Sequence, residues 1–121
     1  PPAGFVVHGY GGAADLLPEL TALGGYFSFA GTVLDPARKR ARAALRAAPR
    51  ARLLLETDAP AMPPPAAYRL PDAEYNEPAN LPLIVAGVAE LLGMPAEDLA
   101  ALTWENGERL LGAGIWPTSS F

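Results

Sequence analysis

The sequence has no cysteine, and it has only one histidine, His8. The absence of cysteine excludes disulfide bonds and thiolate metal ligands, and it is compatible with a reducing compartment, so we expect a cytoplasmic location. No apolar run reaches the roughly 18 residues that a membrane-spanning helix needs. The first residues, PPAGFVVHGY, lack the basic and long apolar regions of a secretory signal. They also lack an initiator methionine, so we expect a processed chain or a piece of a longer one.

Net positive charge is also missing. The chain of 121 residues has a formal net charge of −4, which argues against a protein that coats nucleic acid. The basic residues are nevertheless concentrated, because seven of the nine lie between Arg38 and Arg52. Half of the residues are apolar, which is enough for the core of one domain, and we expect residues 1–121 to form a single domain.

Apolar segments alternate with helical patterns over the first half of the chain. We expect strands at residues 4–10, 26–30 and 52–57, because each is apolar on both faces. We expect helices at residues 15–23 and 36–48, the first capped by an aspartate and the second beginning with an Asp-Pro pair. Strands separated by helices predict an α/β fold with a parallel sheet, in which the chemistry lies at the carboxyl ends of the strands.

The second half of the chain is predicted to be a loop followed by helices. Residues 59–80 are rich in proline and too long for a simple connector, which favours a functional loop. Tyr68 and Tyr75 within it are candidate substrate contacts. Asn80 is expected to cap a strongly apolar helix over residues 81–92, and two further helical segments are expected at residues 95–102 and 103–111.

Polar side chains appear where the predicted strands end. His8 can ligate a divalent metal as a neutral imidazole, or it can be an ordinary hydrogen-bonded histidine. Asp58 follows a buried run, where a carboxylate is costly unless it is paired, binds a cation or caps the next turn. Glu56 shares the face of Asp58 and could be a ligand, a salt-bridge partner or a hydrogen-bond partner of a ligand; the spacing does not choose. One histidine and one aspartate are too few for a catalytic metal site, which typically has three or more protein ligands.

The basic helix contradicts the usual pattern of charge on helices. Arg38, Lys39 and Arg40 fall in its first turns, where the helix dipole disfavours cations. They could contact a phosphate backbone near the strand ends, or they could form a solvated helix face. The other arginines of this region are expected on the solvated surface: Arg42, Arg46, Arg50 and Arg52.

Five segments, taken in order, resemble the carboxyl-terminal part of TatD-family hydrolases: GFVVHGYGG, YFSFAG, RLLLETDAPAMPP, NEPANLP and LTWENGERLLG. The resemblance covers nearly the whole chain. It implies the last three strands of an amidohydrolase-like (β/α)8 TIM barrel, with a site for divalent metal ions (Mg²⁺, Mn²⁺ or Zn²⁺) at the strand ends. It implies that His8 and Asp58 bind metal and that Asp58 is also catalytic, whereas Glu56 is not one of the usual ligands of the family.

The resemblance also implies an activity. Many members of the family are deoxyribonucleases that cleave phosphodiester bonds through a metal-activated water, so we expect DNA or a small phosphoester as the substrate. The amino-terminal histidines and glutamate of the family are absent here, and the chain is expected to need the missing half of the barrel and to be inactive alone. Two alternatives remain: an amide or ester hydrolase of the same superfamily, and a non-catalytic half-barrel used for assembly or binding.

Overall fold

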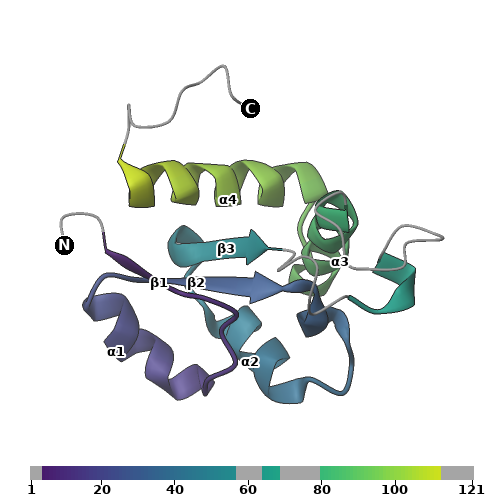
Figure 1. Ribbon diagram of the computed structural model, residues 1–121, viewed down its shortest axis with the longest axis horizontal. Coiled ribbons are helices and arrows are strands. Elements are labelled where there is room, and N and C mark those ends of the chain that lie inside the picture. The colour runs from purple at the N-terminus through teal and green to yellow at the C-terminus, as the bar shows by residue number, and fades with distance from the viewer. Residues whose placement is uncertain (1–3, 57–63, 69–79, 113–121) are drawn as a thin grey trace.

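Three strands pair in parallel and follow the order of the chain. The computed structural model describes residues 4–56, 64–68 and 80–112. The strands are β1 (Phe5–Val7), β2 (Gly25–Ala30) and β3 (Leu53–Glu56), in the spatial order β1-β2-β3 (Figure 1). The prediction of a parallel α/β sheet is therefore confirmed, and the carboxyl ends of all three strands lie at the same end of the sheet.

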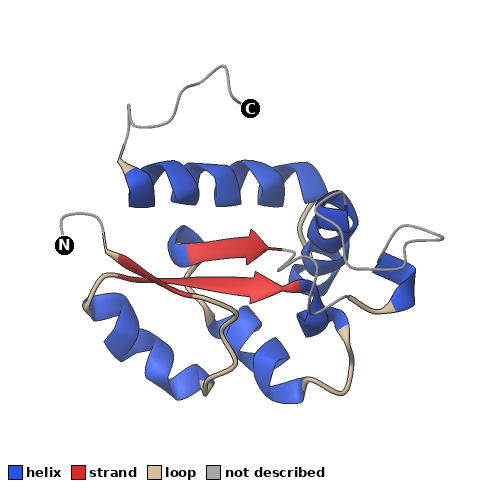
Figure 2. Cartoon of the chain, viewed as in Figure 1, coloured by secondary structure: helices blue, strands red, loops and turns tan. Residues whose placement is uncertain are grey.

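Helices cover both faces of this sheet (Figure 2). Between β1 and β2 the chain forms a 3-10 turn, η1 (Ala14–Leu16), and helix α1 (Leu17–Ala22); between β2 and β3 it forms η2 (Gly31–Leu34), α2 (Lys39–Ala47) and η3 (Arg50–Arg52). Helices α1 and α2 lie on one side of the sheet, and α4 (Ala96–Leu111) lies on the other. Helix α3 (Leu81–Leu92) lies beyond the carboxyl ends of β2 and β3, near the short turn η4 (Ala66–Tyr68).

The core forms around β2, whose six residues are all buried. A central parallel strand between two helical layers has no face in water, which explains the apolar sequence GYFSFA. Side chains from every layer meet there. The largest apolar side chains that are fully buried at the centre of this core are Phe27, Phe29, Leu17, Leu45, Leu53, Ile84, Leu99 and Val88.

Strand β1 is less buried than its sequence predicts. The side chain of Val6 is 41% exposed, although the run FVV favours a strand covered on both faces. In the described part of the chain, β1 pairs only with β2 and is an edge strand, so one of its surfaces lacks a covering layer. The pattern of apolar residues correctly predicts a strand here, but its full burial is wrong for the described residues.

Two helix boundaries also differ from the predictions. Helix α2 begins at Lys39 and not at Pro36, because the Asp35 carboxylate accepts a hydrogen bond from the Ala37 amide at 2.9 Å and forms a turn first. The segments predicted at 95–102 and 103–111 form one continuous helix, α4. The hydroxyl of Thr103 donates back to the Leu99 carbonyl at 3.1 Å, so this polar residue is accommodated inside the helix.

Helix α3 begins after Asn80, as predicted, and it ends at Leu92, before Gly93. Asn80 is fully buried at the residue before the helix, but its side chain makes no capping hydrogen bond to the first turn. Gly93 has a φ of +68°, and the amide of Met94 bonds back to the carbonyl of Ala89 at 3.0 Å. This left-handed ending is the conformation that glycine adopts with least strain. Among the described residues, no helix is both long and apolar enough to cross a membrane.

Asn106 attaches α4 to the beginning of β3. Its side chain is fully buried, and its amide nitrogen donates to the carbonyls of Arg50 and Leu53 at 2.7 and 2.8 Å. Its side-chain oxygen accepts a hydrogen bond from Arg109 of the same helix. One side chain thus satisfies two backbone acceptors, one in η3 just before the strand and one in the first residue of β3, which fixes β3 against the helical layer.

We predict that Asn106→Ala lowers the free energy of unfolding by about 2 to 3 kcal/mol, because it leaves buried carbonyl oxygens without a donor. Urea unfolding followed by circular dichroism measures this change. The matched control is Glu105→Ala, an exposed position on the same helix, which should change stability by less than about 0.5 kcal/mol. Equal effects of the two substitutions would contradict the role assigned to Asn106.

Candidate metal and nucleic-acid site

Three polar residues meet where the three strands end. His8 follows β1 directly, Ser28 lies within β2, and Glu56 is the last residue of β3. Glu56 pairs with Ala30 and Leu54 pairs with Ser28, so Ser28 and Glu56 point to the same face of the sheet. The chain after His8 stays beside β2, because the amide of Tyr10 donates to the carbonyl of Ser28 at 2.7 Å.

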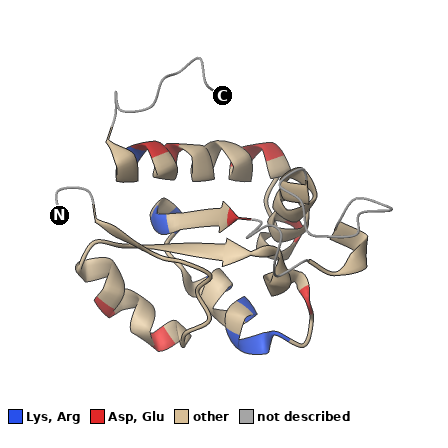
Figure 3. Cartoon of the chain, in the orientation of Figure 1, with Lys and Arg blue, Asp and Glu red and all other residues tan. Residues whose placement is uncertain are grey.

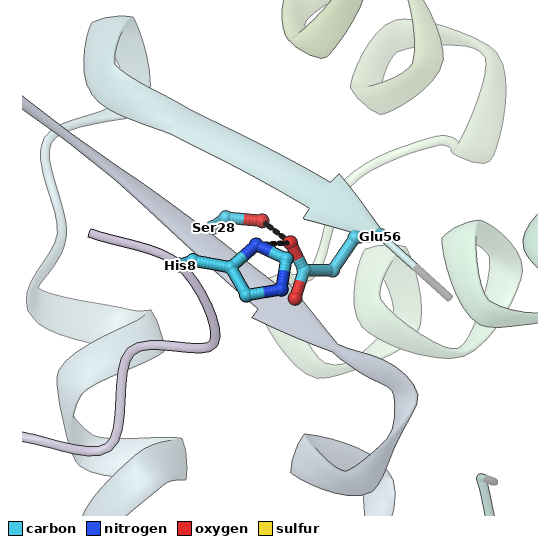
Figure 4. Close-up of polar contacts among 3 residues, drawn as sticks. All are labelled: His8, Ser28 and Glu56. Atoms are coloured by element: carbon cyan, nitrogen blue, oxygen red, sulfur yellow. Dashed lines mark hydrogen bonds and ion pairs between the residues drawn. The ribbon is translucent and has the colours of Figure 1, made fainter. Parts of the chain in front are cut away.

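The carboxylate of Glu56 joins these residues (Figure 4). Its Oε2 atom lies 2.8 Å from Nδ1 of His8, and the same oxygen accepts a hydrogen bond from the Ser28 hydroxyl. The His8 side chain is 67% exposed, whereas that of Glu56 is 16% exposed. Gly9, with a φ of +57°, turns the chain directly after His8. The carboxylate is therefore mostly buried at the carboxyl ends of the strands, and the imidazole lies between it and the solvent.

The donor set fits a divalent cation in part. Imidazole nitrogen and carboxylate oxygen are common ligands of such ions, and Oε1 of Glu56 is buried and has no hydrogen-bond partner among the described residues. A buried carboxylate oxygen without a donor favours a positive charge nearby. The described residues nevertheless contain no group of three or more His, Cys, Asp or Glu side chains that could hold a metal ion. Further ligands are therefore needed, and the predicted ligand Asp58 lies outside the described residues.

The basic residues divide into exposed and structural ones. Arg38, Lys39 and Arg40 are exposed at the beginning of α2, where blue colour gathers in Figure 3. Arg42 instead donates to the carbonyls of Val33 and Leu34 at 3.1 and 2.7 Å, so its prediction as solvated surface is wrong. The three exposed cations remain candidate phosphate contacts.

Arg52 also differs from the prediction of a solvated arginine. Its guanidinium lies 4.8 Å from the centre of the Tyr26 ring and donates to the Gly25 carbonyl at 3.3 Å. Both contacts connect the beginning of β3 to the beginning of β2, at the opposite end of the strands from His8 and Glu56. Arg52 is therefore a structural residue of the sheet.

The comparison with known proteins agrees with this geometry. Residues 1–112 match the family described as TatD related DNase. The chain belongs to the TatD family. It is 33% identical over 107 residues to the metal-dependent hydrolase YabD of Bacillus subtilis, covering 88% of this chain and 40% of that protein. It is 37% identical over 110 residues to the 3'-5' ssDNA/RNA exonuclease TatD of Citrobacter rodentium, covering 90% of this chain and 42% of that protein.

Solved structures of the TatD family have the same fold. The crystal structure of YjjV, a TatD homolog from Escherichia coli K12, matches with a TM-score of 0.73 and 29% identity, over 90% of this chain and 40% of that chain. A TatD family hydrolase from Entamoeba histolytica matches with a TM-score of 0.69 at 18% identity and supports the fold alone. The three strands and their helices are thus part of a TIM barrel. The chain spans about two fifths of the length of these relatives.

The candidate substrate contacts from the proline-rich loop are only partly placed. Tyr68 is half-buried and packs against the core, and a Cβ atom added at Gly87 of α3 would lie 2.7 Å from its ring. Packing against α3 accounts for Tyr68, while its role as a substrate contact stays a prediction. Tyr75, like Asp58 and most of residues 59–80, lies outside the described residues.

Ser28 was not predicted as a site residue, although its position in the carboxyl-terminal half of the second strand was a signal. Apart from the tyrosine hydroxyl, serine has the only polar side chain in the buried run GYFSFA, and it is nearly fully buried. A buried hydroxyl requires a partner, so a serine in such a run points to a polar group on a neighbouring strand. That partner is Glu56.

Tyr10, two residues after His8, has a raised pKa. Burial of the phenol raises its pKa, the nearby Arg40 charge lowers it and Asp15 raises it again, with burial as the largest effect. The hydroxyl donates to the Ala13 carbonyl at 2.6 Å, and the ring contacts Phe27 and Phe29 edge-on. Helix α2 also contacts η1, in the segment that follows β1.

We predict that the protein loses stability in alkaline solution because of Tyr10. A folded-state pKa above the unfolded value of about 10 means that stability is complete below about pH 10 and is lost as the pH rises through the folded pKa. Urea unfolding of the metal-free protein between about pH 8 and pH 11 should show this loss. Tyr10→Phe should lower stability slightly at neutral pH and weaken the alkaline loss; an unchanged alkaline loss would contradict the assignment.

Proposed function

We propose that this chain supplies part of the metal centre of a divalent-metal-dependent hydrolase that cleaves phosphodiester bonds of nucleic acid. The observation that supports it most strongly is the meeting of His8 and Glu56 at the carboxyl ends of parallel strands, where barrel enzymes have their active sites. Membership of the TatD family supports the hydrolase chemistry. The relative named as a 3'-5' ssDNA/RNA exonuclease supports the choice of nucleic acid as substrate.

In this proposal two residues of the chain hold the metal. His8 would bind through its imidazole, and Asp58, two residues after the end of β3, would bind through its carboxylate. A divalent cation held there would act as a Lewis acid on the phosphoryl group and lower the pKa of a water molecule. The carboxylate of Asp58 would also orient the attacking water and accept its proton.

The remaining ligands would come from outside this chain. One histidine and one aspartate are fewer than the three or more protein ligands of a typical catalytic site. The chain covers 40% of YabD and 42% of the Citrobacter TatD, so these relatives contain further sequence that this chain lacks. We propose that an amino-terminal half of the barrel provides those ligands and that the isolated chain has little activity.

The exposed cations at the beginning of α2 would bind the substrate. Arg38, Lys39 and Arg40 are exposed at the beginning of α2, and the charge of Arg40 lowers the pKa of Tyr10, two residues after His8. Helix N-termini in such folds lie at the same end as the strand carboxyl ends. A phosphate backbone that enters the site from this side would meet these charges.

We predict that, in protein carrying the complete barrel, His8→Ala and Asp58→Ala each reduce cleavage of single-stranded DNA by about 100-fold or more. A metal contributes several kcal/mol of transition-state stabilisation, and each 1.4 kcal/mol is worth about tenfold in rate. Initial rates with Mg²⁺ or Mn²⁺ and a labelled oligonucleotide measure the change. Asp98→Ala, an exposed carboxylate on α4, is the control and should retain full activity. Full activity of Asp58→Ala would contradict its role.

A second prediction separates nucleic-acid binding from the chemistry. In the same protein, Arg40→Glu should raise KM for the oligonucleotide several-fold and reduce the salt dependence of binding by about one unit of slope, because one phosphate contact is lost. Hydrolysis of a small phosphodiester such as bis-p-nitrophenyl phosphate should not change. Arg46→Glu is the matched control, because Arg46 is exposed in the last turn of the same helix.

Assays with different substrates also distinguish the nuclease from the alternative functions. Equal effects of Arg40→Glu and Arg46→Glu on the oligonucleotide would contradict a phosphate contact at the beginning of α2. Hydrolysis of small esters or amides without cleavage of DNA or RNA would favour an amide or ester hydrolase. Absence of all hydrolysis in the complete barrel would contradict the proposed function and favour a binding or assembly role.

A further inference from the structure

A network of polar contacts joins Ser28 of β2, Glu56 of β3 and His8, which follows β1 (Figure 4). We infer that Glu56 is a positioning residue that fixes the proton and the orientation of the His8 imidazole, and that Ser28 holds Glu56 in place. This inference rests on the proposed function only in assigning a metal to His8. Which ring nitrogen of His8 carries the proton can be measured in the absence of metal.

The position of the proton follows from the two contacts of one oxygen. An ionised carboxylate can only accept hydrogen bonds. Oε2 of Glu56 accepts from the Ser28 hydroxyl and lies 2.8 Å from Nδ1 of His8, so Nδ1 must carry the proton of a neutral imidazole. The lone pair is then on Nε2. A histidine that donates one ring N–H to a carboxylate while its other nitrogen binds a metal is a common arrangement in metal sites.

Packing alone does not orient the His8 ring. Its side chain is 67% exposed, so it has little contact with the core that could select one rotamer. Glu56 is only 16% exposed, and Ser28 within β2 is nearly fully buried, so both of these groups are fixed by the sheet. The buried serine and carboxylate therefore form the fixed part of this network, and they orient the exposed imidazole.

A different role for Glu56 has a specific consequence that can be tested. Within the part of the chain that the structure describes, its Oε1 atom is buried without a hydrogen-bond partner, and it lies 3.8 Å from a Cβ atom added at Gly9. If Oε1 bound the cation itself, Glu56 would contribute to metal affinity without His8. If Glu56 acts through His8, its contribution must disappear once the imidazole is removed.

The first experiment reads the tautomer of His8 by long-range ¹H–¹⁵N NMR on the metal-free 121-residue chain, under conditions in which the imidazole is neutral. His8 is the only histidine, so its two ring nitrogens give the only imidazole signals. We expect the form protonated at Nδ1 to dominate. In Glu56→Gln and Glu56→Ala the Nε2-protonated form should increase, because a neutral amide or a methyl group no longer requires a proton on Nδ1. Ser28→Ala should give a smaller change in the same direction.

The control is Glu90→Gln, an exposed carboxylate on α3, which should leave the spectrum of His8 unchanged. Glu56→Gln keeps the shape of the side chain, and circular dichroism verifies that each variant is folded. A wild-type chain protonated mainly at Nε2, or a tautomer ratio that Glu56→Gln and Glu56→Ala leave unchanged, would overturn the inference.

The second experiment measures Mn²⁺ affinity by calorimetry in protein with the complete barrel. Glu56→Gln should weaken binding about 10- to 100-fold, as is usual for a partner of a metal-binding histidine. In a His8→Ala background the same substitution should have no further effect. An equal loss in both backgrounds would show that Glu56 binds the cation directly and would overturn the inference. Absence of Mn²⁺ binding in the wild type would overturn the proposed function, while the tautomer measurement decides the inference by itself.

Discussion

Parallel pairing of three short strands is the constraint on which the site depends. A parallel pair needs a crossover connection, and the crossovers α1 and α2 cover one face of the sheet while α4 covers the other. This arrangement buries all of β2 and places the three carboxyl ends at one edge. His8, Ser28 and Glu56 are 20 and 28 residues apart in sequence, from His8 to Ser28 and from Ser28 to Glu56. The sheet alone brings them within hydrogen-bonding distance.

Much of the fold could be predicted from the sequence, because its signals are local. Apolar runs interrupted by glycine and proline predict three strands in the right places, and Gly93 predicts the end of α3. The errors have a common cause. The beginning of α2 depends on a side-chain turn at Asp35, and the exposure of Val6 depends on which strands are neighbours. Neither is visible in the periodicity of the segment itself. The resemblance of the motifs to the TatD family is confirmed by the family match.

The site could be predicted less completely, because it depends on distances between strands. The spacing of Glu56 and Asp58 is compatible with several roles, and only the placement of β1 beside β2 brings His8 to the carboxylate. Arg42 has the sequence context of a solvated arginine, yet it binds two carbonyls of η2. Whether such an arginine is solvated or binds a backbone oxygen depends on the position of a neighbouring turn, here η2. The metal-binding roles of His8 and Asp58 and the single-domain organisation remain predictions.

Within the described residues, both the sheet and the set of metal ligands are incomplete. Among the described residues, strands β1 and β3 each pair on one edge only, and beside β3 lies an open apolar pocket of about 270 Å³ lined by residues that include Leu54, Val85 and Trp104. In the proposed function, the strands that would pair with these edges also carry the missing ligands. A cation that binds both parts would stabilise their association by mass action, because it binds the assembled site and not its separate halves. Assembly of the barrel and metal binding would then be one coupled equilibrium, to which Glu56 would contribute by holding His8 in the orientation that the cation needs.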